Sequence, residues 1–244
     1  MLICSTPGAK FPTTSFLLFP PYNFLVFSSF YTEGAFHALT DKIHMKIICV
    51  GRNYAAHARE LGNEVPEDPV IFMKPASALL REGVDFHYPS FTHDLHYEAE
   101  LVLRISRSGS HLSITEALDY VDAITVGIDF TARDLQAALK AKGLPWEKAK
   151  AWDQAAVIGK WQPMRAGDFH FSMNKNGVKV QQGDTSHMIF SFDVLLAHIS
   201  EYFSLEPGDL IFTGTPAGVG PCVPGDELEG FFDDQSVFIL KIHA

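Results

Sequence analysis

Short apolar runs closed by turn residues recur from residue 45 to the end of the chain, and they constrain the fold more than any other feature. They predict strands at residues 45–50, 70–73, 96–105, 123–129, 210–213 and 237–242. The pair Asn176-Gly177 lies between apolar segments at 169–172 and 178–180. It predicts a two-residue hairpin, because both turn positions need a positive φ that Asn and Gly tolerate.

Helix signals are fewer than strand signals. They predict helices over residues 113–120, 135–142 and 194–203, marked at their starts by Ser113 with Glu116, Thr131 with Asp134, and Asp193. Runs of strands with a few interspersed helices are typical of an α+β fold, mainly β and mainly antiparallel.

The chain has 244 residues, of which 47% are hydrophobic, and we see no internal repeat or linker after residue 44. We therefore expect one catalytic domain over 45–244 and a non-domain N-terminal extension over 1–44. The extension holds an apolar run at 16–31 that Pro20 and Pro21 interrupt, so it is too short and broken for a membrane span of about 20 residues. A signal peptide is the alternative reading of that run.

The formal net charge of −10 disfavours nucleic acid as a partner. Three widely separated cysteines, Cys4, Cys49 and Cys222, disfavour both a disulfide framework and a thiolate zinc site. A reducing compartment fits best, so we expect a cytoplasmic protein that does not bind membranes. Thiol chemistry through Cys49 or Cys222 has little support, since no activating basic residue adjoins either cysteine.

The segment His96-Tyr97-Glu98-Ala99-Glu100 places two carboxylates on one face of a strand, roughly 7 Å apart. A hard divalent cation such as Mg²⁺ or Mn²⁺ would relieve their repulsion and suits oxygen ligands better than zinc does. The alternative is a strand with an ordinary solvent face. Asp129, between an apolar strand and a helix start, would supply a third carboxylate.

Two further segments carry candidate chemistry. One helical turn would bring His57 and Glu60 together, so that the carboxylate orients an imidazole that deprotonates water; an ordinary surface pair is the alternative. The glycine-rich segment 213–221 lacks the Lys-Ser/Thr ending of a phosphate-binding loop. It could hold a substrate carboxylate through Thr215 and its backbone amides, or be a plain multiple turn.

Taken together, these segments resemble the fumarylacetoacetate hydrolase family, particularly its small acylpyruvase branch, over residues 45–244. The resembling blocks, in chain order, are GRNYAAH (51–57), FMKP (72–75), HYEAE (96–100), DFTARDLQ (129–136), GLPWEKAK (143–150), MIFS (188–191) and TGTP (213–216). The departures are the extra 44 N-terminal residues and Trp152, where Phe is usual.

The resemblance implies a mixed β-sandwich roll with a few short helices, and a homodimer. It implies a Mg²⁺ or Mn²⁺ ion held by Glu98, Glu100 and Asp129. His57 with Glu60 on a lid, Lys150 and Gln136 would be catalytic. The substrate-binding residues implied are Arg52, Lys74, Arg133 and Thr215.

The expected reaction is hydrolysis of the carbon-carbon bond of an acylpyruvate, of the fumarylpyruvate or acetylpyruvate type, to pyruvate and a carboxylic acid. His57 would be the general base, and Lys150 or Gln136 would stabilise the oxyanion. The same metal site would serve an oxaloacetate tautomerase or decarboxylase, or a 2-hydroxyhepta-2,4-diene-1,7-dioate isomerase. A chain that has lost catalysis and acts as a metal-binding or interaction module is a further alternative. It is disfavoured because the three carboxylates, Lys150, His57 and Glu60 are all present.

Overall fold

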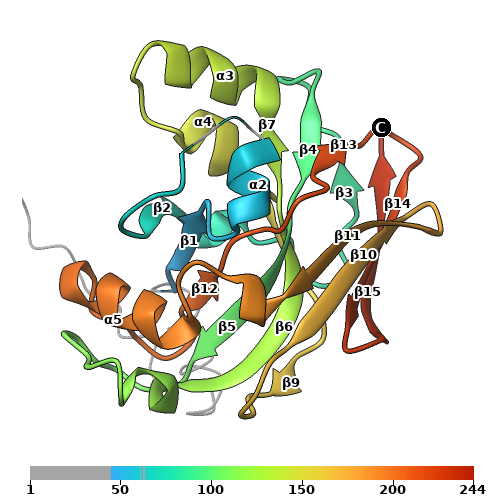
Figure 1. Cartoon of the computed structure of the whole chain (residues 1–244). Helices are drawn as coiled ribbons and strands as arrows, with labels where there is room; N and C mark the ends of the chain where they lie inside the picture. The colour runs from blue at the N-terminus through green and yellow to red at the C-terminus, as the bar shows by residue number, and fades with distance from the viewer. Residues whose placement is uncertain (1–44, 61, 63) are drawn as a thin grey trace, which may run out of the picture.

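The computed structural model describes residues 45–244 except 61 and 63, and the expected N-terminal extension lies outside the described residues. Strands predominate and helices are few and short, as predicted for an α+β, mainly β fold (Figure 1). In the described part of the chain, no helix is long and apolar enough to cross a membrane.

A curled seven-stranded sheet forms the centre, in the order β2-β1-β12-β5-β6-β8, with β9 also paired to β6. Its pairs are antiparallel except β1 with β12. The strands are β1 (Ile47–Gly51), β2 (Val70–Lys74), β5 (Ala99–Ile105), β6 (Val121–Asp129), β8 (Ala156–Ile158), β9 (Gln162–Pro163) and β12 (Leu210–Phe212).

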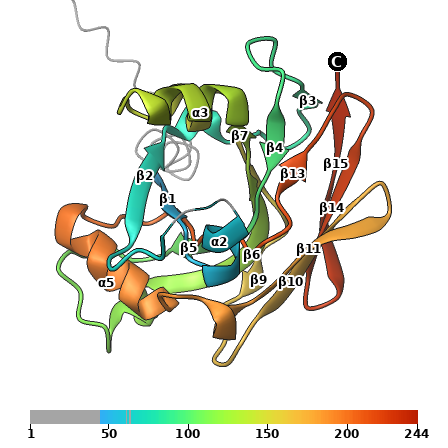
Figure 2. The same ribbon diagram turned by 45° about the horizontal axis from the view of Figure 1, so that its top comes forward.

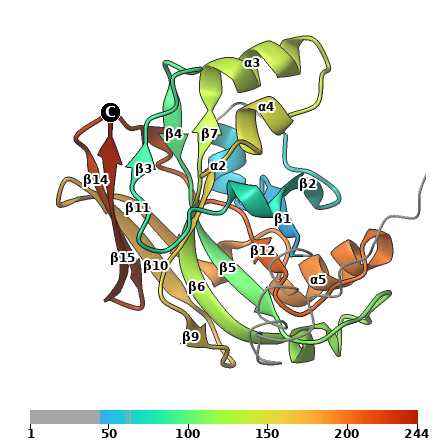
Figure 3. The ribbon, with the colours of Figure 1, turned by 180° about the vertical axis from the view of Figure 1, so that it is seen from behind.

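Two smaller sheets complete the strand framework. A five-stranded sheet in the order β11-β10-β14-β15-β3 forms a separate wall (Figure 3). Its strands are β3 (Phe86–His87), β10 (His170–Lys175), β11 (Val178–Asp184), β14 (Glu227–Phe232) and β15 (Gln235–His243). A three-stranded sheet joins β4 (Leu95–Tyr97), β7 (Thr131–Ala132) and β13 (Gly220–Pro221).

The helices lie around the curled sheet. Helices α3 and α4 cover one end, α5 lies at the other, and α2 lies between them (Figures 1 and 2). The α-helices are α2 (Ala55–Glu60), α3 (Arg133–Ala141), α4 (Glu147–Lys150) and α5 (Phe192–Tyr202), and the 3₁₀ helices are η1 (Ala76–Ala78), η2 (Ala117–Tyr120) and η3 (Thr185–His187).

Both faces of the central sheet are covered, and β1 shows why its sequence is continuously apolar. Ile48 and Val50 belong to the main hydrophobic cluster, whereas Ile47 and Cys49 belong to a second cluster on the opposite face. Because successive side chains of a strand point to opposite faces, a sheet buried on both sides needs apolar residues at every position.

The hairpin and most strands are confirmed, with one break. Asn176 and Gly177 have φ values of 52° and 76° and join the antiparallel strands β10 and β11. The segment predicted as one strand over 96–105 is two strands that meet at Glu98. The reason is that β4 pairs with β7 and β13, whereas β5 pairs with β6 and β12.

Two helix starts differ from their predictions. Thr131 lies in β7 and does not cap α3, which begins at Arg133; the Asp134 carboxylate instead accepts hydrogen bonds from the Thr92 hydroxyl and the Leu135 amide. The segment at 113–120 forms only the 3₁₀ helix η2 at its end.

The third helix starts close to its prediction. Helix α5 begins at Phe192, two residues before the predicted position, and the Asp193 carboxylate accepts a hydrogen bond from the Val194 amide. Asp193 therefore supports the first turn from within the helix.

Candidate active site

Three carboxylates meet at adjacent strand ends. Glu98 lies at the junction of β4 and β5, Glu100 is in β5, and Asp129 is the last residue of β6. Because β5 and β6 pair antiparallel with Glu100 opposite Gly127, the start of one strand lies beside the end of the other. Each residue offers one oxygen, and these oxygens lie within 4.8 Å of one another in a buried position.

Cationic side chains compensate two of the three carboxylates. The Lys150 Nζ lies 2.8 Å from Glu98 Oε2 and 2.6 Å from Asp129 Oδ2. The Arg133 Nη2 lies 2.6 Å from Glu98 Oε1, and the Lys74 Nζ lies 2.7 Å from Asp129 Oδ1. Burial alone would raise the pKa of Glu98, but Lys150 and Arg133 outweigh it and hold that pKa well below its usual range.

Glu100 differs from its neighbours, since no described residue forms an ion pair with it. Its Oε2 accepts a hydrogen bond of 2.8 Å from the Gly214 amide. Burial, followed by the charges of Asp129 and Glu98, raises the pKa of Glu100 well above its usual value. Gly214 has a φ of 99°, and a Cβ there would lie 2.6 Å from the Asn53 Cβ, so only glycine fits this approach.

The residues present fit a divalent cation. The site offers three buried oxygen ligands, and one of the three carboxylates, Glu100, has no cationic partner among the described residues. An all-oxygen set of this kind suits a hard ion such as Mg²⁺ or Mn²⁺. A bound cation would relieve the repulsion that raises the pKa of Glu100.

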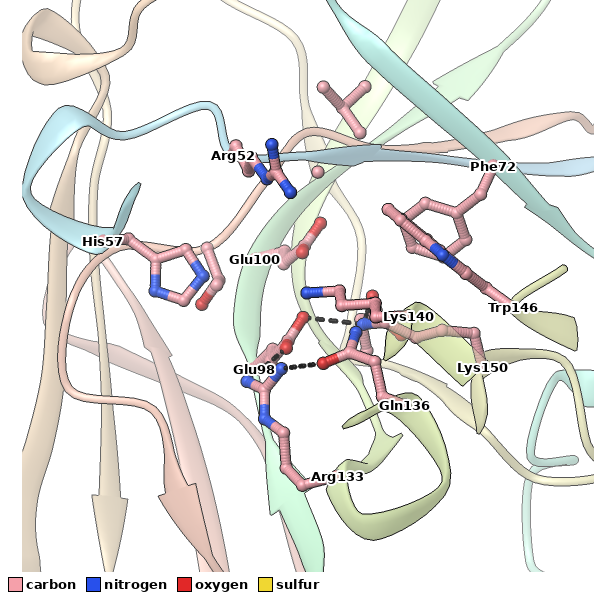
Figure 4. Close-up of a pocket in the computed structure, with 14 residues that line it drawn as sticks. Arg52, His57, Phe72, Glu98, Glu100, Arg133, Gln136, Lys140, Trp146 and Lys150 are labelled. Carbon is pink, nitrogen blue, oxygen red and sulfur yellow. Dashed lines mark hydrogen bonds and ion pairs between the residues drawn. The ribbon is translucent and has the colours of Figure 1, made fainter. Parts of the chain in front are cut away.

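An open pocket leads to the carboxylates (Figure 4). Its lining includes nine of the predicted site residues, namely Arg52, His57, Glu98, Glu100, Asp129, Arg133, Gln136, Lys150 and Thr215. Three other large side chains also line the pocket, Phe72, Lys140 and Trp146, and none of them had a predicted role.

His57 and Glu60 face each other across one turn of α2. The His57 Nδ1 lies 3.3 Å from Glu60 Oε2, and His57 itself is buried. The Glu60 carboxylate also accepts a hydrogen bond from the Gly218 amide in the glycine-rich segment. Burial lowers the pKa of His57 from 6.5, and the charge of Glu98 and the hydrogen bond to Glu60 oppose that shift only in part. The imidazole is therefore neutral near pH 7 and able to accept a proton.

Helix α3 presents one polar face to the pocket. The Arg133 Nη1 donates a hydrogen bond of 2.8 Å to Gln136 Oε1, and the Gln136 amide hydrogens remain to bind other groups. Lys140 lies on the same face, since residues seven apart in a helix are in line. This spacing is the sequence signal that would have found Lys140.

Lys74, predicted to bind substrate, lies behind the carboxylates and outside the pocket lining. It is only 1% exposed, because its ammonium is held by Asp129 and the Lys150 carbonyl oxygen. Its position is that of a residue that fixes Asp129, and its expected role in substrate binding stays a prediction.

Thr215 lies in the pocket wall and is nearly buried. Its hydroxyl donates to the Ala99 carbonyl oxygen over 2.8 Å and accepts from Gln181 Nε2 over 2.9 Å. Gln181 belongs to β11 of the five-stranded sheet, and no pattern in its own segment pointed to this contact.

Comparison with known proteins identifies the class of enzyme. The sequence model described as "Fumarylacetoacetate (FAA) hydrolase C-terminal" matches residues 46–242. The chain therefore belongs to the fumarylacetoacetate hydrolase family, as the sequence motifs predicted, and it has the fold of that family.

Several similar proteins are described with a particular reaction. The chain is 43% identical over 187 residues to the mitochondrial oxaloacetate tautomerase FAHD1 of Arabidopsis thaliana, covering 75% of this chain and 84% of that protein. It is 41% identical over 189 residues to a mitochondrial oxaloacetate decarboxylase of Dictyostelium discoideum, covering 75% and 87%. A fumarylpyruvate hydrolase from Pseudomonas aeruginosa, solved with Mn²⁺ and pyruvate, superposes with a TM-score of 0.77 at 37% identity, covering 81% and 89%.

Proposed function

We propose that this enzyme hydrolyses the carbon-carbon bond of acylpyruvates, giving pyruvate and a carboxylic acid. The observation that carries the proposal is the buried His57, which contacts Glu60 through Nδ1 and lines the same pocket as the three carboxylates. A general base that activates water is needed for hydrolysis and is not needed for tautomerisation.

The metal would be Mg²⁺ or Mn²⁺, held by Glu98, Glu100 and Asp129. When bound, the cation would act as a Lewis acid on the 2-oxo group and stabilise negative charge that develops on the pyruvate portion. The neighbour solved with Mn²⁺ and pyruvate supports the ion class and a 2-oxo acid as ligand.

The protein's own groups would carry out the proton transfers. When Nδ1–H donates a hydrogen bond to Glu60, the Nε2 of the neutral His57 carries no proton. Nε2 can then take a proton from water as the water oxygen attacks the distal carbonyl carbon. The amide hydrogens of Gln136 would stabilise the oxyanion, because Lys150 is already engaged by Glu98 and Asp129. The bond to C3 of the pyruvate unit then breaks, and the proton held by His57 passes to that carbon.

A second candidate is keto-enol tautomerisation or decarboxylation of oxaloacetate. Its support is the identity above 40% to the two relatives named for those reactions. The same cation would stabilise the enolate in either reaction, so the two candidates differ in whether His57 must activate a water. Isomerisation of 2-hydroxyhepta-2,4-diene-1,7-dioate would use the same site.

Product formation distinguishes the candidates. The full chain with Mg²⁺ or Mn²⁺ should release pyruvate from acetylpyruvate or fumarylpyruvate, and a chelator should stop the release. His57→Ala should lower hydrolysis by about 10²- to 10⁴-fold, the usual contribution of a general base. The exposed His187, outside the pocket lining, gives the control His187→Ala. Turnover of enol-oxaloacetate alone, at full rate in His57→Ala, would establish the tautomerase instead.

The remaining expectations are a homodimer, a cytoplasmic location and no nucleic-acid or membrane partner. The two named relatives are described as mitochondrial, so localisation of a tagged full chain is the direct test of the cytoplasmic expectation.

A further inference from the structure

The pocket holds more positive charge than its carboxylates use. Arg133 and Lys150 are paired with the carboxylates, as described above. Arg52 and Lys140 line the same pocket, yet within residues 45–60, 62 and 64–244 neither makes an ion pair (Figure 4). The chain as a whole has a net charge of −10, so two uncompensated cations at one pocket make this region unusually positive.

Arg52 is held in place by its surroundings. Its φ is 61°, a left-handed conformation that a residue with a side chain adopts at a cost. The next residue, Asn53, keeps the segment fixed through hydrogen bonds from its side chain to the Phe190 and Thr213 carbonyl oxygens and from the Phe190 amide. The strained conformation therefore persists and directs Arg52 towards the pocket.

Lys140 is placed against an apolar wall. Its Nζ lies 5.6 Å from the centroid of the Trp146 ring, and Trp146 in turn contacts Phe72 with ring centroids 5.8 Å apart. Burial, and then the charges of Arg52 and Arg133, lower the pKa of Lys140. These cations repel one another, and an anion bound between them would relieve that repulsion.

We propose that Arg52 and Lys140 bind the distal carboxylate of the substrate and so select 2-oxo dicarboxylic acids over monocarboxylic ones. The inference rests on the proposed function, which puts the 2-oxo acid head at Glu98, Glu100 and Asp129. The carbon chain between the two ends would pack against Phe72 and Trp146. Fumarylpyruvate and oxaloacetate carry a distal carboxylate, at C7 and C4 respectively, whereas acetylpyruvate ends in a methyl group.

Substrate comparison in variants tests the subsite. Lys140→Met and Arg52→Met should each lower kcat/KM for fumarylpyruvate or oxaloacetate by about 10- to 100-fold, the usual loss of one charge-assisted hydrogen bond. The value for acetylpyruvate should change less than about threefold, and Lys140→Arg should restore part of the loss. Lys142→Met is the matched control, since Lys142 is exposed at the end of the same helix and outside the pocket.

A binding measurement separates this inference from the proposed function. With the full chain and Mn²⁺, calorimetry should show tighter binding of 2-oxoglutarate than of pyruvate, and Lys140→Met and Arg52→Met should abolish that difference. If the variants lose the preference for 2-oxoglutarate but the unaltered chain turns over no substrate, the subsite is supported and the proposed function is wrong. Turnover with an unchanged preference, or an equal loss for all three substrates, would overturn the subsite. Thermal unfolding of each variant establishes that it is folded.

Discussion

The five-stranded sheet and the site wall, by which we mean the strand ends that carry Glu98, Glu100 and Asp129, bury different kinds of side chain. In β14 the side chains alternate between buried and less buried, and the buried ones, such as Leu228 and Phe232, are apolar. At the junction of β4, β5 and β6, the buried side chains include Glu98, Glu100 and Asp129. The first arrangement follows from the hydrophobic effect alone. The second costs free energy of desolvation and is stable only because opposite charges accompany it.

The carboxylates themselves give the largest expected effect. Glu98→Gln removes one ligand charge and should lower metal-dependent turnover by more than about 100-fold, since even groups that only support a ligand contribute 10- to 100-fold. The fold should survive, because Gln keeps the shape of the side chain. Steady-state turnover with saturating Mn²⁺, together with circular dichroism, checks both statements. Unchanged turnover in the purified variant would remove Glu98 from the site.

Lys150 should reveal how far the site depends on charge compensation. Lys150→Met leaves Glu98 and Asp129 short of a partner, and breaking a buried pair from one side costs about 3–5 kcal/mol. Added Mn²⁺ should recover part of that free energy of unfolding, because the cation supplies positive charge to the same oxygens. Urea unfolding with chelator and with Mn²⁺ measures the difference.

Met173→Ala is the matched change in the five-stranded sheet. Met173 is fully buried in β10, so the cavity should cost about 2–5 kcal/mol. This loss should be the same with chelator and with Mn²⁺, and kcat/KM per folded molecule should not change. An equal response of the two variants to Mn²⁺ would mean that the contrast between the two regions is wrong.

The parts of the fold that could be predicted from the sequence are those that depend on local interactions. The Asn176-Gly177 hairpin depends on local φ preferences and neighbouring apolar residues, and it was found correctly. The break at Glu98 was missed because it depends on which partners β4 and β5 find elsewhere in the chain. The helix start at Thr131 was wrong because a tertiary contact to Thr92 takes the Asp134 carboxylate.

The site likewise contains residues that the sequence predicts and contacts that it does not. Family motifs indicated the three carboxylates, and their positions fit a cation site. Motifs do not report charge balance, so the ion pair of Lys74 with Asp129 was not foreseen and Lys140 was given no role. The contact of Gln181 with Thr215 crosses from one sheet to another, and only the folded structure reveals it.

A smaller effect is expected at the edge of the site, in the pH dependence. Glu60 raises the pKa of His57, which burial lowers from 6.5. Glu60→Gln should therefore lower that pKa further. Because His57 acts as a base when neutral, the acidic limb of kcat/KM should move to lower pH, while the rate on the plateau falls from poorer orientation. A pH profile with Mn²⁺ held constant measures both, and a limb that moves to higher pH would contradict the assignment.

The smallest effect is expected from a surface charge pair of the five-stranded sheet. The Lys241 Nζ lies 3.9 Å from Glu227 Oε2, and the two side chains are 68% and 44% exposed. Water screens such a pair and its ordering costs entropy, so Lys241→Ala should change the free energy of unfolding by less than about 0.5 kcal/mol. The double variant with Glu227→Ala isolates the pair. A coupling above about 1 kcal/mol would show that this sheet, like the site wall, depends on charge, and the distinction between the two regions would then be one of degree.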